Sequence, residues 1–129
     1  MKTEPTDIDR EAAGLFNAAP GMRVVYVSSA NGRRKLEWCR VRDGASGVYG
    51  APDALDTDDP ATVGCMLAQV EASAPGLAVS VADRWHNLPG DSDRRFLVLV
   101  DHAEGHQTTA TGPTRGATLV AAMRKLKGA

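Results

Sequence analysis

Residues 59–127 decide the fold of this chain, and they read DPATVGCMLAQVEASAPGLAVSVADRWHNLPGDSDRRFLVLVDHAEGHQTTATGPTRGATLVAAMRKLK. Helix signals open this stretch and recur near its end. Asp59-Pro60 is a preferred N-cap followed by a preferred first helical residue, and residues 112–114, Gly-Pro-Thr, precede a second, Ala-rich helix. Apolar runs between the two helices predict strands over 77–82, 96–100 and 107–111. The predicted order is therefore helix, three strands, helix.

The helix predicted over 60–73 has the most regular apolar pattern in the chain. Its apolar residues recur at i, i+3, i+4 and i+7 and so share one face: Val63, Met66, Leu67 and Val70. Pro75-Gly76 then predicts the end of this helix. The closing helix, over 114–127, is predicted to bury Ala117, Val120, Met123 and Leu126.

The first 50 residues predict a short helix and a β-hairpin. The helix is expected over 7–19, with Thr6 or Asp7 as its N-cap. Asn31 and Gly32 both tolerate the positive φ that a type I′ turn requires. They are therefore predicted to join two strands of a hairpin, over 22–29 and 35–42.

Residues 50–58 form an acidic connector, which we interpret as an exposed crossover and not as a domain boundary. A short strand over 47–49 is expected before it. The residues on its N-terminal side would make a poor separate core. At 129 residues, with 43% apolar and 24% charged residues, the composition is that of one soluble globular domain. The predicted fold is a single α+β domain, 1–129, whose antiparallel sheet carries two helices on one face; an N-terminal helix and hairpin (1–50) accompany the α-β-β-β-α unit (59–127).

Charge, cysteines and hydropathy limit the function classes. The net charge of −1 gives no global attraction to nucleic acid or to acidic membranes. Cys39 and Cys65 each lie in an apolar run, so buried free thiols are expected. The polar, acidic N-terminus is unlike a signal peptide, and no apolar run approaches the roughly 20 residues that span a bilayer. We expect a cytoplasmic protein that has no membrane partner.

No metal, cofactor or catalytic site is predicted. His102 and His106 flank a turn at Gly105, and no Cys or carboxylate completes a metal-binding pattern around them. The acidic residues near the connector lack the central Gly and terminal Glu of a calcium loop, so we expect a solvent-exposed loop at Asp53, Asp56, Asp58 and Asp59. The sequence contains neither a nucleophile elbow nor a phosphate-binding Gly-rich loop.

Basic residues beside predicted turns are candidate binding residues. Between residues 22 and 42 the chain has six cations and one acid, a local charge of +5. Two interpretations stay open for these cations: a surface for phosphates or an acidic partner, or solvated residues that protect strand edges. Those nearest the turns are Arg33, Arg34, Lys35, Arg94 and Arg95.

Trp85 lies in a polar loop, 85–93, and is the candidate aromatic anchor. If exposed, it would suit a protein partner, because Trp and Arg dominate interface energetics. If folded back, it would cap the core. The sequence leaves both interpretations open.

The order of elements from residue 60 resembles the double-stranded-RNA-binding domain. Phe96–Val100 resembles the middle strand of that family, and Ala110–Arg115 resembles the start of its last helix. The resemblance implies binding of RNA phosphates, for which the family uses a lysine cluster at the start of that helix. Residues 114–118 hold one cation at this place.

A second resemblance covers nearly the whole chain. The runs 21–23 (Gly-Met-Arg), 52–55 (Pro-Asp-Ala-Leu) and Asp59–Ala68 look like small, mostly uncharacterised phage and prophage proteins that carry a PDL…DPATLGCLLALV run. Those proteins also end in a Thr-led helix rich in Ala and Leu, as residues 114–126 do. The resemblance implies a viral origin and a fold like an α-β-α sandwich, and it implies no activity.

These observations lead us to expect a non-enzymatic phage or prophage accessory protein that binds a protein partner in the host cytoplasm, such as a defence factor that it antagonises. The expected binding residues are Arg33, Arg34, Lys35, Trp85, Arg94 and Arg95. A nucleic-acid-binding domain that uses the basic loops is one alternative, and a small-molecule binder is another. The sequence leaves the oligomeric state and the partner open.

Overall fold

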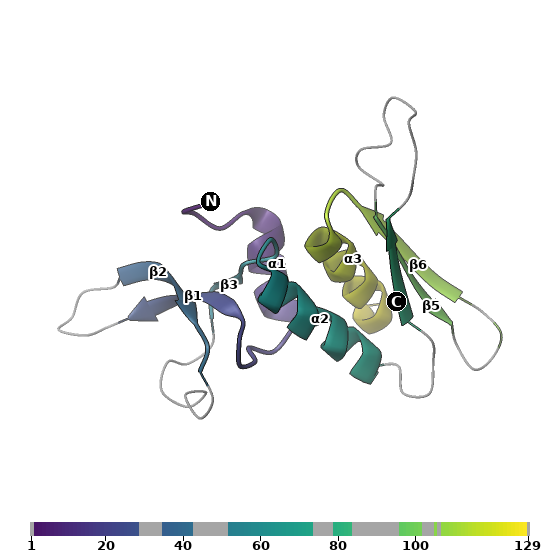
Figure 1. Cartoon of the computed structure of the whole chain (residues 1–129), viewed down its shortest axis with the longest axis horizontal. Coiled ribbons are helices and arrows are strands. Elements are labelled where there is room, and N and C mark those ends of the chain that lie inside the picture. The colour runs from purple at the N-terminus through teal and green to yellow at the C-terminus, as the bar shows by residue number, and fades with distance from the viewer. Residues whose placement is uncertain are drawn as a thin grey trace. The chain divides into compact units, whose positions relative to one another are not determined.

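The described helices and strands follow the predicted order, with one further strand at residues 54–55 that was not predicted. A computed structural model of the chain describes residues 2–28, 35–42, 52–73, 79–83, 96–101, 105 and 107–128. Its elements are α1 (Asp7–Leu15), β1 (Arg23–Ser28), β2 (Lys35–Arg40), β3 (Ala54–Leu55), α2 (Pro60–Ser73), β4 (Val79–Asp83), β5 (Phe96–Asp101), β6 (Gln107–Gly112) and α3 (Arg115–Gly128) (Figure 1). The α+β class and the antiparallel strand pairing are confirmed.

The strands of the described ranges form two three-stranded antiparallel sheets, in the orders β2-β1-β3 and β4-β5-β6. The contacts between Cα atoms divide the chain into two compact units, Met1–Cys65 and Met66–Ala129. The boundary falls within α2. Each unit therefore contains one of the two sheets, together with the helix residues that fall within its range.

β1 is the central strand of the first unit. It pairs with β2 through Val25↔Trp38 and with β3 through Val24↔Leu55. Val24 and Val25 point to opposite faces of the sheet and are both buried, so both faces of β1 are covered. The buried apolar residues of this unit are Ala12, Phe16, Met22, Val24, Val25, Val41, Ala54 and Leu55.

The β1–β2 register agrees with the predicted hairpin. The last described pair is Ser28↔Lys35, and Asn31 and Gly32 lie between these two residues in the sequence. These are the residues for which the sequence predicts a type I′ turn. The turn itself lies outside the described residues, as does the strand predicted over 47–49.

α1 begins where predicted and ends early. Thr6 is its N-cap, in a capping box with Asp9 as the reciprocal partner. The helix stops at Leu15, before the predicted residue 19, because Phe16 turns to extended backbone (φ −119, ψ 150) and is buried in the core. Core packing of Phe16 thus takes precedence over continuation of the helix toward Pro20.

α2 begins as predicted, but its buried face differs from the predicted one in three positions. Asp59 caps the helix: its carboxylate accepts a hydrogen bond from the backbone N–H of Thr62 at 3.0 Å. Met66 and Val70 are buried as expected, whereas Val63 and Leu67 are only partly buried. Thr62 is fully buried as well, four residues before Met66 and on the same face.

The second unit has the predicted strand order. β5 is central, with Val98 and Val100 buried, and β6 is an edge strand of this sheet. α3 packs on β6 and β5 (Figure 1). It is capped by Thr114, whose hydroxyl accepts the N–H of Ala117 at 3.1 Å.

α3 also approaches the end of β6 closely. A Cβ at Gly112 would lie 2.8 Å from Oγ1 and 3.0 Å from the backbone nitrogen of Thr118. The predicted inward residues Val120 and Met123 are buried, while Ala117 and Leu126 are partly exposed. Near the end of α2, the Ser73 hydroxyl lies 3.9 Å from the Met123 sulphur. This contact connects the last turn of α2 with α3.

Candidate functional site

The sequence-predicted binding residues fall almost entirely outside the described part of the chain. Lys35 is the exception: it begins β2, where its backbone pairs with Ser28, and its side chain is not described. The histidines considered as metal ligands, His102 and His106, also lie outside the described residues. The others outside this part are Arg33, Arg34, Trp85, Arg94 and Arg95.

The acidic connector is not the solvent-exposed loop that we expected. Asp56, Thr57 and Asp59 are 2%, 4% and 6% exposed, while Asp53 and Asp58 are exposed. Much of the connector is buried because it contributes the strand β3. On either side of β3, the N–H of Asp53 donates to the carbonyl of Val25 and the N–H of Asp56 donates to the carbonyl of Arg23, both in β1. Asp56 and Thr57, which follow β3, are consequently buried in the first unit, whereas Asp58 is exposed.

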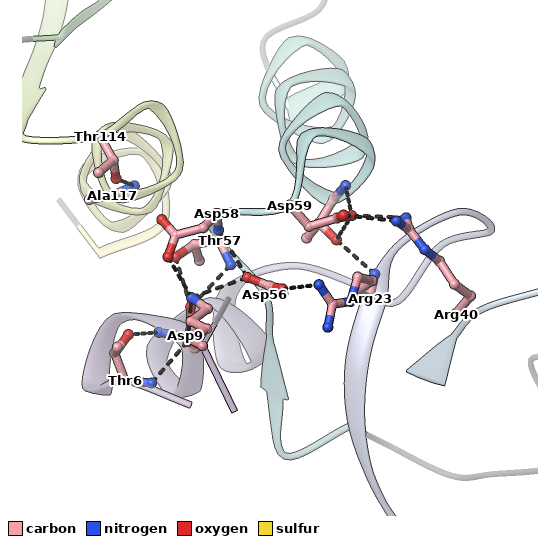
Figure 2. Close-up of polar contacts among 12 residues, drawn as sticks. Thr6, Asp9, Arg23, Arg40, Asp56, Thr57, Asp58, Asp59, Thr114 and Ala117 are labelled. Atoms are coloured by element: carbon pink, nitrogen blue, oxygen red, sulfur yellow. Dashed lines mark hydrogen bonds and ion pairs between the residues drawn. The ribbon is translucent and has the colours of Figure 1, made fainter. Parts of the chain in front are cut away.

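A cluster of charged side chains surrounds the end of β3 (Figure 2). The Nζ of Lys2 lies 2.8 and 2.7 Å from the two carboxylate oxygens of Asp9. It also lies 3.0 Å from Asp58 and 3.2 Å from Asp56. One ammonium group therefore bridges carboxylates from α1 and from the connector.

Asp9 is the most enclosed member of this cluster. Its side chain is 0% exposed, and it accepts hydrogen bonds from the backbone N–H of Thr6 (2.9 Å) and of Thr57 (3.0 Å). The Thr57 hydroxyl donates to it as well, at 2.7 Å. Burial alone would raise the pKa of Asp9, but the hydrogen bonds from Lys2, Thr6 and Thr57 outweigh burial and hold the pKa below its ordinary value.

Lys2 has the complementary shift. Its side chain is 18% exposed, and burial alone would lower its pKa. The contacts with Asp9, Asp58 and Asp56 stabilise the charged form more strongly, so the pKa of Lys2 lies above its ordinary value. Both partners of the buried ion pair are thus held in their charged forms at neutral pH.

Trp38 forms an aromatic wall of the same cluster. Its ring centroid lies 5.8 Å from the Lys2 Nζ and 5.6 Å from the Arg23 guanidinium carbon, distances at which cation–π attraction operates. Arg23 in turn forms an ion pair with Asp56 at 3.1 Å. The indole nitrogen of Trp38 is buried and has no hydrogen-bond partner among the described residues.

A second ion pair fixes the N-terminus of α2 to the hairpin. Arg40 donates to both carboxylate oxygens of Asp59, each at 2.9 Å, and to the carbonyl of Gly21 at 2.8 Å. The Thr62 hydroxyl lies 3.0 Å from Asp59 and accepts the backbone N–H of Arg23 at 2.7 Å. Asp59 therefore acts both as a helix cap and as the partner of a β2 arginine (Figure 2).

These contacts change the interpretation of the basic region. Two of the six cations between residues 22 and 42, Arg23 and Arg40, are neutralised by carboxylates of the connector region, Asp56 and Asp59. Each of these four side chains has an internal partner. The described part of the chain contains no group of three or more side chains placed to hold a metal ion.

The cysteine prediction was half right. Cys39 and Cys65 are free thiols, as expected, but both are partly exposed and not buried. Cys65 lies on the α2 side that faces Pro20, whose carbonyl is 3.4 Å from its sulphur. Among the described residues, no helix has the length and apolar character needed to cross a membrane.

Sequence reasoning missed the cluster around Asp9 because its members are far apart in the chain. Asp9 and Thr57 are separated by 48 residues, and Arg40 and Asp59 by 19. The capping-box spacing from Thr6 to Asp9 was the only local signal, and it indicates a helix start and not a charged cluster.

No protein-family model matches the chain, and neither a curated protein nor a solved structure is detectably similar to it.

Proposed function

We propose that this chain is a non-enzymatic phage or prophage accessory protein that binds a protein partner, such as a host defence factor. The observation that carries the proposal is the internal pairing of the charges in the first unit. Asp9, Asp56 and Asp59 each accept contacts from cations or backbone N–H groups of the same unit. Side chains engaged in this way stabilise a fold and are poor candidates for acid–base chemistry.

The same pairing favours a protein over a nucleic acid as the partner. Affinity for nucleic acid comes mainly from cations that neutralise phosphates. Arg23 and Arg40 already have carboxylate partners at 3.1 and 2.9 Å, so binding phosphates through them would require breaking internal ion pairs. The excess positive charge of residues 22–42 is smaller in the fold than in the sequence.

The connection between β4 and β5 supplies the proposed contact residues. Asp83 pairs with Phe96, so the chain leaves and re-enters the second sheet at one end. Trp85 and Arg95 are within two positions of that pair in the sequence. Trp and Arg are the residues most enriched in the energetic centres of protein interfaces.

Capture of a partner from lysates of bacterial hosts, followed by purification of that partner, tests the proposal. We expect Trp85→Ala with Arg94→Ala to weaken the affinity of the purified pair at least tenfold, since truncation of central interface residues costs about 2 kcal/mol or more. Arg10→Ala is the matched control, because the Arg10 side chain is exposed and its described partner is the exposed Asp7, at 3.5 Å. Equal affinities for the two variants would contradict the proposed contact residues.

Nucleic-acid binding is the competing function, and it depends on Arg33, Arg34 and Lys35 beside the β1–β2 pairing. On duplex DNA, a plot of the logarithm of the binding constant against the logarithm of the salt concentration would then have a slope of about −0.9 for each phosphate neutralised. We expect a slope near zero for the wild-type chain. A steep slope that Arg33→Glu with Arg34→Glu abolishes would replace the protein-binding proposal.

A further inference from the structure

The feature with the most unassigned chemistry is the site that holds the Lys2 ammonium. Three carboxylates lie within 3.2 Å of its nitrogen, and the Trp38 ring lies 5.8 Å away. Carboxylates combined with an aromatic face are the groups that recognise an alkylammonium ion. The site, which we call the ammonium cradle, consists of Asp9, Trp38, Asp56 and Asp58.

Three of the four cradle residues, Asp9, Trp38 and Asp56, have contacts other than those with Lys2. Asp9 is fixed by hydrogen bonds from Thr6 and Thr57, and Asp56 by the ion pair with Arg23 (Figure 2). Trp38 lies in β2, in register with Val25. The cradle is therefore built by α1, the β1–β2 pair and the connector, and three of its four members have contacts besides those with Lys2.

The segment that delivers Lys2 has few described contacts besides those of the Lys2 ammonium group. Residues 2–5 precede the Thr6 cap and form neither helix nor strand, and Thr3 and Glu4 are exposed. The Lys2 side chain is the part of this segment that enters the first unit, with 18% of its surface exposed. Residues 2–5 thus form a strap anchored at one end by the α1 cap and at the other by one ammonium group.

Charge complementarity identifies what the cradle would bind without the strap. With Lys2 in place, the two cations Lys2 and Arg23 face three carboxylates. Without Lys2, Arg23 alone would face them, and the Trp38 ring would lose one of its two cations. The uncovered surface would carry net negative charge beside an aromatic ring, which suits a primary ammonium group.

We propose that the strap is an autoinhibitory contact and that the ammonium cradle binds a lysine side chain of the protein partner when Lys2 leaves it. This inference rests on the proposed protein-binding function and names the chemistry of one contact. Lys2 and the partner lysine compete for the same three carboxylates. Neutralising Lys2 should therefore favour the partner.

The test uses the full chain with Nα-acetyl-lysine N-methylamide as the probe and its norleucine counterpart as the uncharged control. The readout is the NMR resonance of the Trp38 indole N–H. We expect Lys2→Gln to bind the lysine probe at least tenfold more tightly than the wild type and not to bind the norleucine probe. Lys2→Arg, which keeps the charge, should behave like the wild type. Lys125→Gln, which alters a lysine bonded to the Thr109 carbonyl, is the matched control.

A second variant keeps the test decisive if Lys2→Gln fails to fold. Thr3→Gly with Glu4→Gly leaves Lys2 and the cradle unchanged and makes the strap more flexible, which raises the entropy cost of holding it. Probe binding should then tighten about two- to threefold over the wild type. Equal probe affinity of this variant and the wild type, or no lysine-specific shift in a folded Lys2→Gln chain, would overturn the inference.

The outcomes separate this inference from the proposed function. A partner whose affinity depends on Trp85 but is the same for wild type and Lys2→Gln would uphold the protein-binding function and refute the strap. Lysine-probe binding by Lys2→Gln, with no protein partner found, would uphold the cradle and refute the proposed function.

Discussion

At the scale of single residues, Asp9 combines complete burial with full charge. A buried carboxylate is tolerated when it is paired and hydrogen-bonded, because its lost hydration must be replaced. Hydrogen bonds to the Asp9 carboxylate replace that hydration. Lys2 and Thr6, which precede Asp9 in the sequence, and Thr57, which follows it, donate these bonds. Asp9 thereby connects the start of α1 to the residues that follow β3.

Asp9→Asn should lower the free energy of unfolding by about 2 kcal/mol, because hydrogen bonds to a charged group are each worth about 1.5–3 kcal/mol and the amide retains some of them. Urea denaturation measures the change. Asp7→Asn is the matched control: it lies in the same helix turn, its side chain is fully exposed, and it should cost less than about 1 kcal/mol. Equal losses for the two variants would mean that the Asp9 contacts add nothing beyond the helix dipole.

At the scale of elements, Thr62 joins α2 to β1. Its buried hydroxyl lies 3.0 Å from the Asp59 carboxylate and accepts the N–H of Arg23 at 2.7 Å. The second contact satisfies the first backbone donor of β1. A helix residue therefore completes the hydrogen bonding of a strand 39 positions earlier in the chain.

Thr62→Val should destabilise the chain by about 1–3 kcal/mol, because the part-buried Arg23 N–H would lose its acceptor. Thr62→Ser keeps the hydroxyl and should cost about 1 kcal/mol or less, the contribution of one methyl group. The two unfolding midpoints, compared in urea, give the measurement. A larger loss for Ser than for Val would show that packing, and not the hydroxyl, is what matters at this position.

The junction of β6 and α3 gives a second test at this scale. Gly112→Ala should destabilise the chain by about 1–3 kcal/mol, because the new Cβ would lie 2.8–3.2 Å from Oγ1, N and Cα of Thr118, two of them backbone atoms. Gly64→Ala is the control with the opposite sign. Gly64 is an exposed position within α2 with nothing within 4 Å of the added atom, so alanine should stabilise by about 0.5–1 kcal/mol. Thermal unfolding of both variants measures whether Gly112→Ala lowers the midpoint temperature and Gly64→Ala raises it.

The elements predicted correctly are those with local signals. Thr6, Asp59 and Thr114 are caps because a side-chain oxygen next to the first helical turn satisfies free N–H groups, which depends only on neighbouring residues. β3 was missed because two residues give no periodicity. The short strand exists because β1 offers free hydrogen-bonding groups to the connector, a condition that local sequence does not record.

At the scale of the whole molecule, the candidate site shows what composition can and cannot predict. The counts of charged residues suggested a basic hairpin region and an exposed acidic connector. The structure brings members of the two groups together as the pairs Arg23–Asp56 and Arg40–Asp59. The sequence left two interpretations of the local cations open, and neither included these pairs, because the pairing depends on the fold.

The pH dependence of unfolding belongs to this scale as well. Asp9 has a folded-state pKa below its ordinary value of 3.8, so its stabilisation is complete above about pH 4 and is lost as the pH falls through the folded pKa. Lys2 has a folded-state pKa above its ordinary value of 10.5, so its stabilisation is present below that pH and is lost as the pH rises through the folded pKa. We expect a plateau of stability between about pH 5 and pH 10.

Urea midpoints measured across the pH range test this expectation. Asp9→Asn should reduce the acid-side loss, since the variant has no carboxylate to protonate at that position. Lys2→Gln should reduce the alkaline-side loss for the corresponding reason. If the urea midpoint of both variants changes with pH as it does in the wild type, other groups cause the pH dependence.

The enclosure of Lys2 also decides where a label can be fused to this chain. An affinity tag placed directly ahead of residue 2 would crowd a side chain that is 82% covered, and would disturb the strap before any partner is added. Gly128 is exposed at the other terminus, so a tag there avoids this interference. Reagents tagged at the N-terminal end and at the C-terminal end are therefore not interchangeable for this protein.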